Sequence, residues 1–118
     1  MEPLIYTLIR EADWRAAEAA GAYAGSSDDR RDGFLHFSTA AQLRASAAKH
    51  RAGVRDLWMI EADANALGDA LKWEPAAGGS RPGLFPHLYA ALPLGAIRRA
   101  VPLPLDAAGL HSFPAEIP

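Results

Sequence analysis

The sequence predicts a single α+β domain in which two helices pack on a twisted sheet that is mixed or mainly antiparallel. Two Ala-rich helical segments lie in the first half of the chain, β-rich runs occur throughout, and the second half is mostly strand and turn. Half of the 118 residues are apolar, which is enough for one hydrophobic core. We therefore expect one domain over residues 1–118, with a core at 4–105 and a tail at 106–118 that lies over the surface.

The composition argues against several classes of protein. A formal net charge of −2 at pH 7 does not suit a general nucleic-acid-binding protein, whose phosphate contacts require a surplus of Lys and Arg. The absence of cysteine removes disulfides, thiolate nucleophiles and Cys-based metal sites. No apolar run is long enough to span a bilayer, and the first residues lack the pattern of a secretory signal. We expect a soluble, cytoplasmic protein without membrane association.

The first third of the chain predicts a strand, a helix and a loop. Residues 3–9, PLIYTLI, form a β-rich run. Residues 11–21, EADWRAAEAAG, combine helix propensity, an acidic first turn and a terminal glycine, and Trp14 should anchor this helix to the core. Residues 24–33, AGSSDDRRDG, are rich in turn-forming types, so we expect a loop there.

The segment GFLHFST, residues 33–39, is predicted to be extended and two-faced. Successive side chains of a strand point to opposite sides, so Leu35 and Phe37 share one face, which we expect to pack on the core. His36 and Ser38 share the other face. An unpaired buried polar group costs about 1–3 kcal/mol, so both must be hydrogen-bonded, solvated or used by a ligand. We expect this face to line a cleft.

A second helix is predicted to follow directly. Thr39 and Gln42 form a T-x-x-Q capping box at the start of TAAQLRASAAKHRAG, and basic residues fill the last turn before Gly53. Ser38 is an equally good alternative for the cap. The serine therefore has a structural role open to it beside a role in the cleft.

The rest of the chain predicts mostly strands. The expected strands are 54–63, 71–75, 87–92 and 96–103, with a short helical turn at 64–70 and a Gly- and Pro-rich loop at 76–86. This loop is a candidate flap. The segment from 104 to 118 is punctuated by proline and should lack regular structure, with His111 solvated.

Three short motifs place polar groups beside bulky apolar anchors. GFLHFST, LKWEP (71–75) and FPHLY (85–89) do so, and their polar members are His36, Ser38, Glu74, His87 and Tyr89. Each also has a structural alternative: a histidine that donates to a backbone carbonyl, a carboxylate paired with a neighbouring cation, or an aromatic ring in the core. No H-x-H or H-E-x-x-H spacing supports a metal site, so we predict none.

Taken together, these motifs carry a family resemblance. The order of Ile-Tyr near the start, Trp in the first helix, G-x-Y, GFLHFST with a following Gln-Leu, LKWE and FPHLY resembles the bacterial family known as domain of unknown function 952, over residues 4–105. The resemblance implies a fold similar to that of the ADP-ribosyltransferases, which cleave NAD between nicotinamide and ribose. NAD is then expected as a substrate and not as a permanently bound cofactor.

On this resemblance, Glu74 and His36 are the predicted catalytic residues. Cleavage of NAD develops positive charge on the ribose, and a fixed carboxylate stabilises that charge, which is the role expected of Glu74. The residues predicted to bind the nucleotide are His36, Ser38, Arg81, His87 and Tyr89. Tyr89 or Trp73 would stack on a flat ring, and His87 would act as a ligand contact or a general base.

The chain departs from the expected pattern at two places. Relatives are expected to carry IYH-like sequence where this chain has Thr7, which donates one hydrogen bond but does not replace an imidazole. The loop GGSRPG at 78–83 lacks the G-x-G-x-x-G fingerprint and the P-loop lysine, so Arg81 is the obvious phosphate partner there. Two alternatives to an NAD-cleaving enzyme stay open: a module that binds a nucleotide-like small molecule without chemistry, and a protein-interaction domain.

Overall fold

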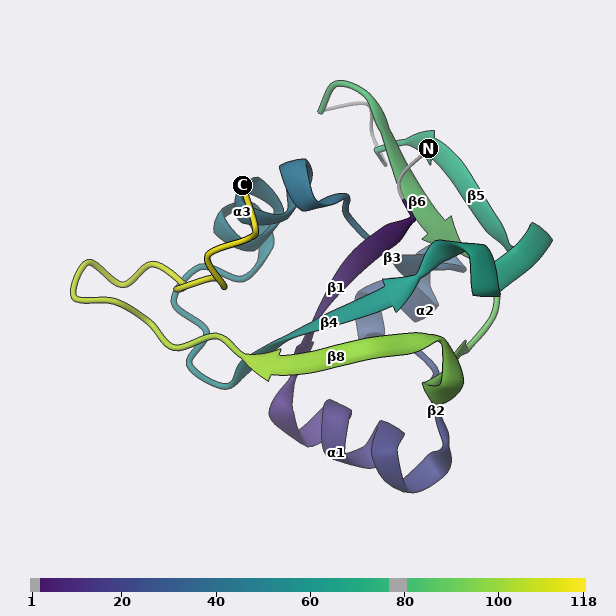
Figure 1. Cartoon of the computed structure of the whole chain (residues 1–118), viewed down its shortest axis with the longest axis horizontal. Coiled ribbons are helices and arrows are strands. Elements are labelled where there is room, and N and C mark those ends of the chain that lie inside the picture. Colours follow the sequence, from purple (N-terminus) through teal and green to yellow (C-terminus); the bar gives the residue numbers. More distant parts are fainter. Residues whose placement is uncertain (1–2, 77–80) are drawn as a thin grey trace.

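The computed structural model describes residues 3–76 and 81–118, and every strand pair in it is antiparallel (Figure 1). The strands are β1 (Leu4–Arg10), β2 (Ala22–Tyr23), β3 (Leu35–His36), β4 (Leu57–Asp63), β5 (Leu71–Pro75), β6 (Leu84–Leu88), β7 (Leu92–Pro93) and β8 (Ile97–Pro102). The helices are α1 (Glu11–Ala20), α2 (Ser27–Asp32) and α3 (Ala40–His50), with 3-10 turns η1 (Ala64–Ala70) and η3 (Leu94–Ala96). The predicted α+β class and the mainly antiparallel pairing are confirmed, but the described strands form three sheets, β1-β4-β8, β2-β7 and β3-β6-β5, instead of one.

Strand β4 is the central strand of the sheet β1-β4-β8 and separates two apolar clusters. Leu57 and Met59 pack on one side, in a cluster with α3 and the C-terminal tail. Trp58 and Ile60 contact the other side, where α1 inserts Trp14. This alternation follows from the two-residue period of a strand, and the predicted anchoring of the first helix by Trp14 is confirmed.

The extended segment 35–38 connects the two halves of the fold. On one edge, the Phe37 amide donates to the Pro86 carbonyl at 3.0 Å, next to the pairing of β3 with β6. On the other edge, Tyr6 and Ser38 exchange two backbone hydrogen bonds of 2.8 Å. The segment therefore lies between β1 and β6. Leu35 and Phe37 are both buried, which confirms the predicted core face.

The prediction of a loop at 24–33 is wrong, because this segment contains α2. Ser26 accepts a hydrogen bond from the Asp29 amide, and the Asp29 carboxylate accepts one from the Ser26 amide, so the two residues form a capping box. Gly33, at a φ of 88°, ends the helix in the left-handed conformation. Serine, aspartate and glycine serve turns and helix ends alike, which is why the composition pointed to a loop. The described residues thus contain three α-helices instead of the two predicted.

Helix α3 begins as predicted, with Thr39 as its cap. The Thr39 hydroxyl accepts from the Gln42 amide, and the Gln42 side chain accepts from the Thr39 amide. Ser38 takes no part in the cap. Its hydroxyl lies 2.7 Å from the hydroxyl of Ser46 in the second half of α3, so the alternative role for Ser38 as cap does not apply.

The C-terminal tail lacks helices and strands, as predicted, but is anchored more firmly than a surface-lying segment. Ile117 is buried in the cluster beneath β4. Arg44 of α3 donates to the Ile117 carbonyl, and Arg99 of β8 pairs with Glu116. His111 was expected to be solvated, which is wrong: it is buried, with Nε2 2.7 Å from the Val54 carbonyl oxygen.

Part of the flap at 76–86 lies outside the described residues, since the description omits 77–80, and its last residues belong to β6. The helical turn predicted at 64–70 is confirmed as η1. Within the described ranges, no helix is long and apolar enough to cross a bilayer.

Removal of the Thr39 side-chain cap should destabilise the protein without changing its fold. We expect Thr39→Ala to lower the free energy of unfolding by about 1 kcal/mol, because an amide at the start of α3 loses its acceptor. Thr39→Ser keeps the hydroxyl and is the matched control. Urea denaturation followed by circular dichroism measures both variants, and equal stability of the alanine and serine variants would contradict the role of the cap.

Candidate functional site

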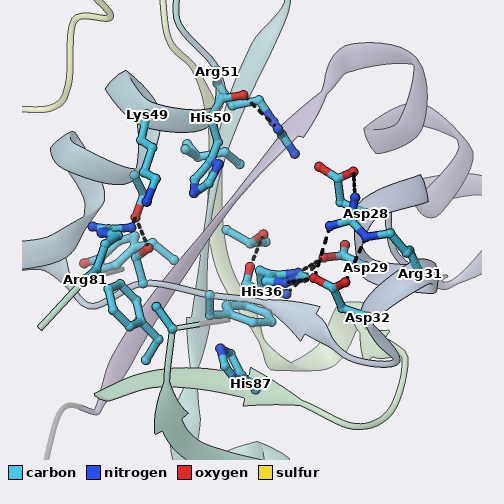
Figure 2. Close-up of a pocket in the computed structure, with 18 residues that line it drawn as sticks. Asp28, Asp29, Arg31, Asp32, His36, Lys49, His50, Arg51, Arg81 and His87 are labelled. Atoms are coloured by element: carbon cyan, nitrogen blue, oxygen red, sulfur yellow. Dashed lines mark hydrogen bonds and ion pairs between the residues drawn. The ribbon is translucent and has the colours of Figure 1, made fainter. Parts of the chain in front are cut away.

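A cavity of about 380 Å³ lies between α2 and α3, over the extended segment 35–38 (Figure 2). Small-molecule sites typically measure about 300–1,000 Å³, so this cavity falls at the lower end of that range. Four of the predicted ligand-binding residues line it, namely His36, Ser38, Arg81 and His87. The prediction that GFLHFST directs its polar face to a cleft therefore agrees with the position of the cavity.

The imidazole of His36 is held between two carboxylates of α2. Its Nδ1 lies 2.6 Å from Asp29 Oδ1, and its Nε2 lies 2.9 Å from Asp32 Oδ2. The His36 amide also donates to Asp29 Oδ1. Because a carboxylate only accepts hydrogen bonds, this geometry favours an imidazolium that donates from both nitrogens. His36 thus fastens α2 to the extended segment with both of its ring nitrogens.

The pKa values of this group agree with a charged pair. The hydrogen bond to Asp29 raises the pKa of His36 above its ordinary value, although burial opposes the shift. Burial tends to raise the pKa of Asp29, but hydrogen bonds from His36 and Ser26 outweigh it, so the net pKa is lowered. The pKa of Asp32 is also lowered, chiefly by the hydrogen bond from Arg31. His36 is therefore poorly suited to act as a general base.

Arg81 reaches the cavity from the other side and is fixed by α3. Its Nη1 donates to the Ser46 hydroxyl at 3.0 Å, and Ser46 in turn contacts Ser38. The guanidinium also lies over the ring of Phe85, 4.5 Å from the ring centroid. Burial lowers the pKa of Arg81. The guanidinium is thus partly removed from water and held in one place.

The last turn of α3 adds more basic side chains to this wall. Ser46, Lys49 and His50 lie at positions i, i+3 and i+4, so they share one helix face, and Arg51 follows at the end of the helix. Figure 2 shows Lys49 and Arg81 across the cavity from Asp29 and the rest of α2. Burial lowers the pKa of His50, and the charges of Lys49, Arg51 and Arg81 lower it further. This wall is therefore electropositive.

His87 forms the floor on the side of β6, where it is nearly fully buried. Its Nδ1 lies 2.8 Å from Glu74 Oε1, and the Tyr89 hydroxyl donates to the same oxygen at 2.7 Å. Phe34 stacks on the imidazole, with ring centroids 4.0 Å apart and an interplanar angle of 24°. The group formed by His87, Glu74 and Tyr89 is thus joined to the cavity through His87.

Comparisons with known proteins bear on this arrangement. Residues 8–100 match the model of a family described as a protein of unknown function, DUF952. The chain belongs to the DUF952 family. Its structure is similar to the crystal structure of protein CC0527 from Caulobacter crescentus, with a TM-score of 0.85 and 40% sequence identity over 92% of this chain and 93% of that chain. The solution structure of CC0527 gives a TM-score of 0.80 and 41% identity, over 92% and 90% of the two chains. Among curated proteins, none matches.

The predicted site residues of this DUF952 protein separate into two groups. His36, Ser38, Arg81 and His87 line the cavity, as described above. Glu74 and Tyr89 are not among the lining residues and touch the cavity only through their bonds to His87. Tyr89 follows the end of β6 and is 47% exposed. The catalytic role of Glu74 stays a prediction.

Two predicted accessory residues have structural positions. Trp73, one of the two rings predicted to stack on a ligand, packs against the buried core cluster. Thr7 donates from Oγ1 to the His36 carbonyl at 2.9 Å, at the wall of the cavity. Its hydroxyl therefore positions the segment that carries His36, and does not substitute for an imidazole. In the described part of the chain, no group of three or more His, Asp or Glu side chains is arranged to hold a metal ion.

Sequence reasoning missed the partners of His36 and most of the basic wall. The signal for Asp29 was the S-x-x-D spacing with Ser26, which is a helix-start pattern. The signal for Lys49 and His50 was their i+3 and i+4 spacing from Ser46. From the sequence, Lys49 and His50 were interpreted only as basic residues that complement the dipole at the C-terminal end of the helix. That interpretation does not indicate which part of the protein this helix face lies against.

The raised pKa of His36 predicts a specific dependence of stability on pH. A histidine whose pKa is higher in the folded state than its ordinary 6.5 contributes stability that is fully present below that value and is lost as the pH rises through the folded pKa. We expect the stability difference between wild type and His36→Gln to shrink as the pH rises above about 6.5. Asp29 and Asp32 remain ionised throughout a series from about pH 5 to 9.

His50 provides a control of opposite sign. Because its pKa is lowered, its unfolded form binds more protons near pH 6.5, so wild type should gain stability relative to His50→Gln as the pH rises. Chemical denaturation across the pH series measures both differences. A difference for His36→Gln that does not change with pH would rule out the ion pairs with α2.

Proposed function

We propose that this DUF952 protein binds a small phosphate-bearing metabolite of the nucleotide class in the cavity between α2 and α3. The observation that carries the proposal is the excess of cations on one wall. Within residues 3–76 and 81–118, neither Arg51 nor Arg81 has a carboxylate at ion-pair distance, although both line the cavity. Guanidinium groups that line a cavity are suited to a phosphate, which accepts two parallel hydrogen bonds.

The opposite wall does not cancel this charge. Asp28 and Asp32 pair with Arg31, and Asp29 and Asp32 contact His36, so two cations of the same wall offset most of the charge of the three α2 carboxylates. The pKa of His50 is lowered first by burial and then by the charges of Lys49, Arg51 and Arg81, as expected for an imidazole on a wall that carries several cations. An anion in the cavity would offset these positive charges.

The size and lining of the cavity favour a mononucleotide or a comparable fragment. A volume of about 380 Å³ is small for a whole dinucleotide, and the opening to solvent leaves room for the remainder of a longer ligand outside. Phe37 and Phe85 contribute apolar surface beside the charged groups. A ligand with one anionic end and one flat or apolar end would match both kinds of surface.

NAD belongs to this class of ligand, and the resemblance to ADP-ribosyltransferases makes its cleavage a further candidate activity. The position of Glu74 gives this activity less support than binding. Its carboxylate accepts hydrogen bonds from His87 and Tyr89, and its contact with the cavity is indirect. A protein-interaction domain, by contrast, would need neither a cavity nor converging cations. Binding is therefore the function that the geometry supports best.

Titration calorimetry with AMP, NAD and inorganic phosphate tests the proposal. We expect saturable binding of AMP that weakens by about tenfold or more in Arg51→Gln and in Arg81→Gln, because each change removes a charge-assisted hydrogen bond worth about 1.5–3 kcal/mol. Arg55→Gln is the matched control, because Arg55 is exposed and does not line the cavity. Its affinity for AMP should equal that of wild type.

Two results would overturn the proposal. One is the absence of saturable binding of all three compounds at millimolar concentration. The other is binding of AMP that is equal in Arg51→Gln, Arg81→Gln and Arg55→Gln, because the ligand would then lie elsewhere. Nicotinamide release, followed in the NAD titration, reports separately whether cleavage accompanies binding.

A further inference from the structure

We infer that His87 presents an unprotonated Nε2 to the cavity as an acceptor for a ligand hydroxyl, and that Glu74 is the positioning residue that fixes it in this form. The inference rests on the proposed function and narrows its ligand class. A site with cations for a phosphate and an acceptor for a hydroxyl selects a sugar phosphate, such as the ribose phosphate of a nucleotide, over phosphate alone.

The contact with Glu74 determines which nitrogen of His87 carries the proton. Nδ1 of His87 lies 2.8 Å from Glu74 Oε1, and an ionised carboxylate has no proton to give. Hydrogen bonds from Tyr89 and then His87 lower the pKa of Glu74, so the carboxylate is ionised. In a neutral imidazole the proton must then reside on Nδ1, and Nε2 is left as an acceptor.

Two further contacts hold the imidazole in place. Phe34 stacks on its face at a centroid distance of 4.0 Å, which sets the plane of the ring. The Tyr89 hydroxyl donates to the same Glu74 oxygen at 2.7 Å, which limits rotation of the carboxylate. The ring plane and the direction of its nitrogens are therefore both fixed before a ligand arrives, as a preorganised binding group requires.

Nε2 of His87 remains available to a ligand. In the described part of the chain, Nε2 has no hydrogen-bond partner. Every fully buried side-chain nitrogen or oxygen in that part does have a partner, so Nε2 is not fully buried. Nε2 must therefore reach open space, although His87 as a whole is only 4% exposed. Because His87 lines the cavity, that space is the cavity.

Other polar groups of the cavity are already engaged with one another. Both nitrogens of His36 contact carboxylates, and the hydroxyls of Ser38 and Ser46 contact each other. Arg51 and Arg81 are donors only and suit phosphate oxygens. A phosphate ester carries a charge of about −1.5 to −2 at pH 7, so it is mostly without a proton to donate to Nε2. The group that meets His87 must therefore carry its own proton, and a sugar hydroxyl adjacent to the phosphate meets this requirement.

The first experiment determines the tautomer of His87 in the ligand-free protein by long-range proton–nitrogen correlation spectroscopy. We expect the proton on Nδ1 in wild type, and loss of this preference in Glu74→Gln, whose amide can donate as well as accept. Glu18→Gln, which removes the same charge from an exposed pair with Arg15, is the matched control and should leave the tautomer unchanged. A proton on Nε2 in wild type would overturn the inference.

The second experiment compares the binding of AMP and 2′,3′-dideoxy-AMP. Wild type should prefer AMP by about five- to tenfold, as expected for one hydrogen bond, and His87→Leu should bind both equally. Equal affinities in wild type would overturn the inference but leave the proposed function in place if binding still depended on Arg51 and Arg81. If AMP, 2′,3′-dideoxy-AMP and inorganic phosphate all fail to bind, both the inference and the proposed function are wrong. If His87→Leu fails to fold, the inference is tested by two wild-type measurements, the preference for AMP over 2′,3′-dideoxy-AMP and the tautomer of His87.

Discussion

The exchange of backbone hydrogen bonds between Tyr6 and Ser38 is the constraint on which the rest of the structure depends. It joins the sheet β1-β4-β8 to the sheet β3-β6-β5 through a segment that has only four extended residues, 35–38. With both backbone edges occupied, the segment can direct its side chains only up or down. Leu35 and Phe37 are buried in the core. His36 and Ser38, on the opposite face, line the space between α2 and α3, and Phe37 also borders it, so the cavity follows from the way the two sheets are joined.

The two helices that border this space acquire opposite electrostatic character from their own termini. Helix α2 is only six residues long and contributes Asp29, which caps its start, and Asp32, which ends it. Helix α3 presents its C-terminal turn, where the charge of Lys49 complements the helix dipole. Residues that stabilise the ends of the two helices therefore also form the acidic and basic walls of one cavity. Arg31 and His36 offset most of the charge of the acidic wall, whereas within residues 3–76 and 81–118 Arg51 and Arg81 have no carboxylate at ion-pair distance, which is the basis for proposing an anionic ligand.

The sequence predicted most of what depends on local patterns and little of what depends on partners. The alternation in GFLHFST correctly placed Leu35 and Phe37 in the core, and the T-x-x-Q spacing correctly identified the cap of α3. Helix α2 was missed because Ser, Asp and Gly are favoured both in turns and at helix ends. His111 was misplaced because burial of one tail residue depends on a carbonyl 57 positions away, which no local pattern reports.

The two cavity histidines show why residue type alone does not assign a role. His36 and His87 are register partners on neighbouring strands, with ring centroids 5.8 Å apart, and both contact Phe34. Carboxylates occupy both nitrogens of His36, whereas a carboxylate occupies only one nitrogen of His87. Both ring nitrogens of His36 thus bind α2, while in the described part of the chain Nε2 of His87 has no hydrogen-bond partner. The carboxylates that contact His36 belong to α2, whereas the carboxylate that contacts His87 belongs to β5. The two histidines therefore acquire different hydrogen-bond partners only when the chain folds. His36, at the centre of GFLHFST, therefore helps to build the cavity, and its register partner His87 is the residue that we propose contacts a ligand.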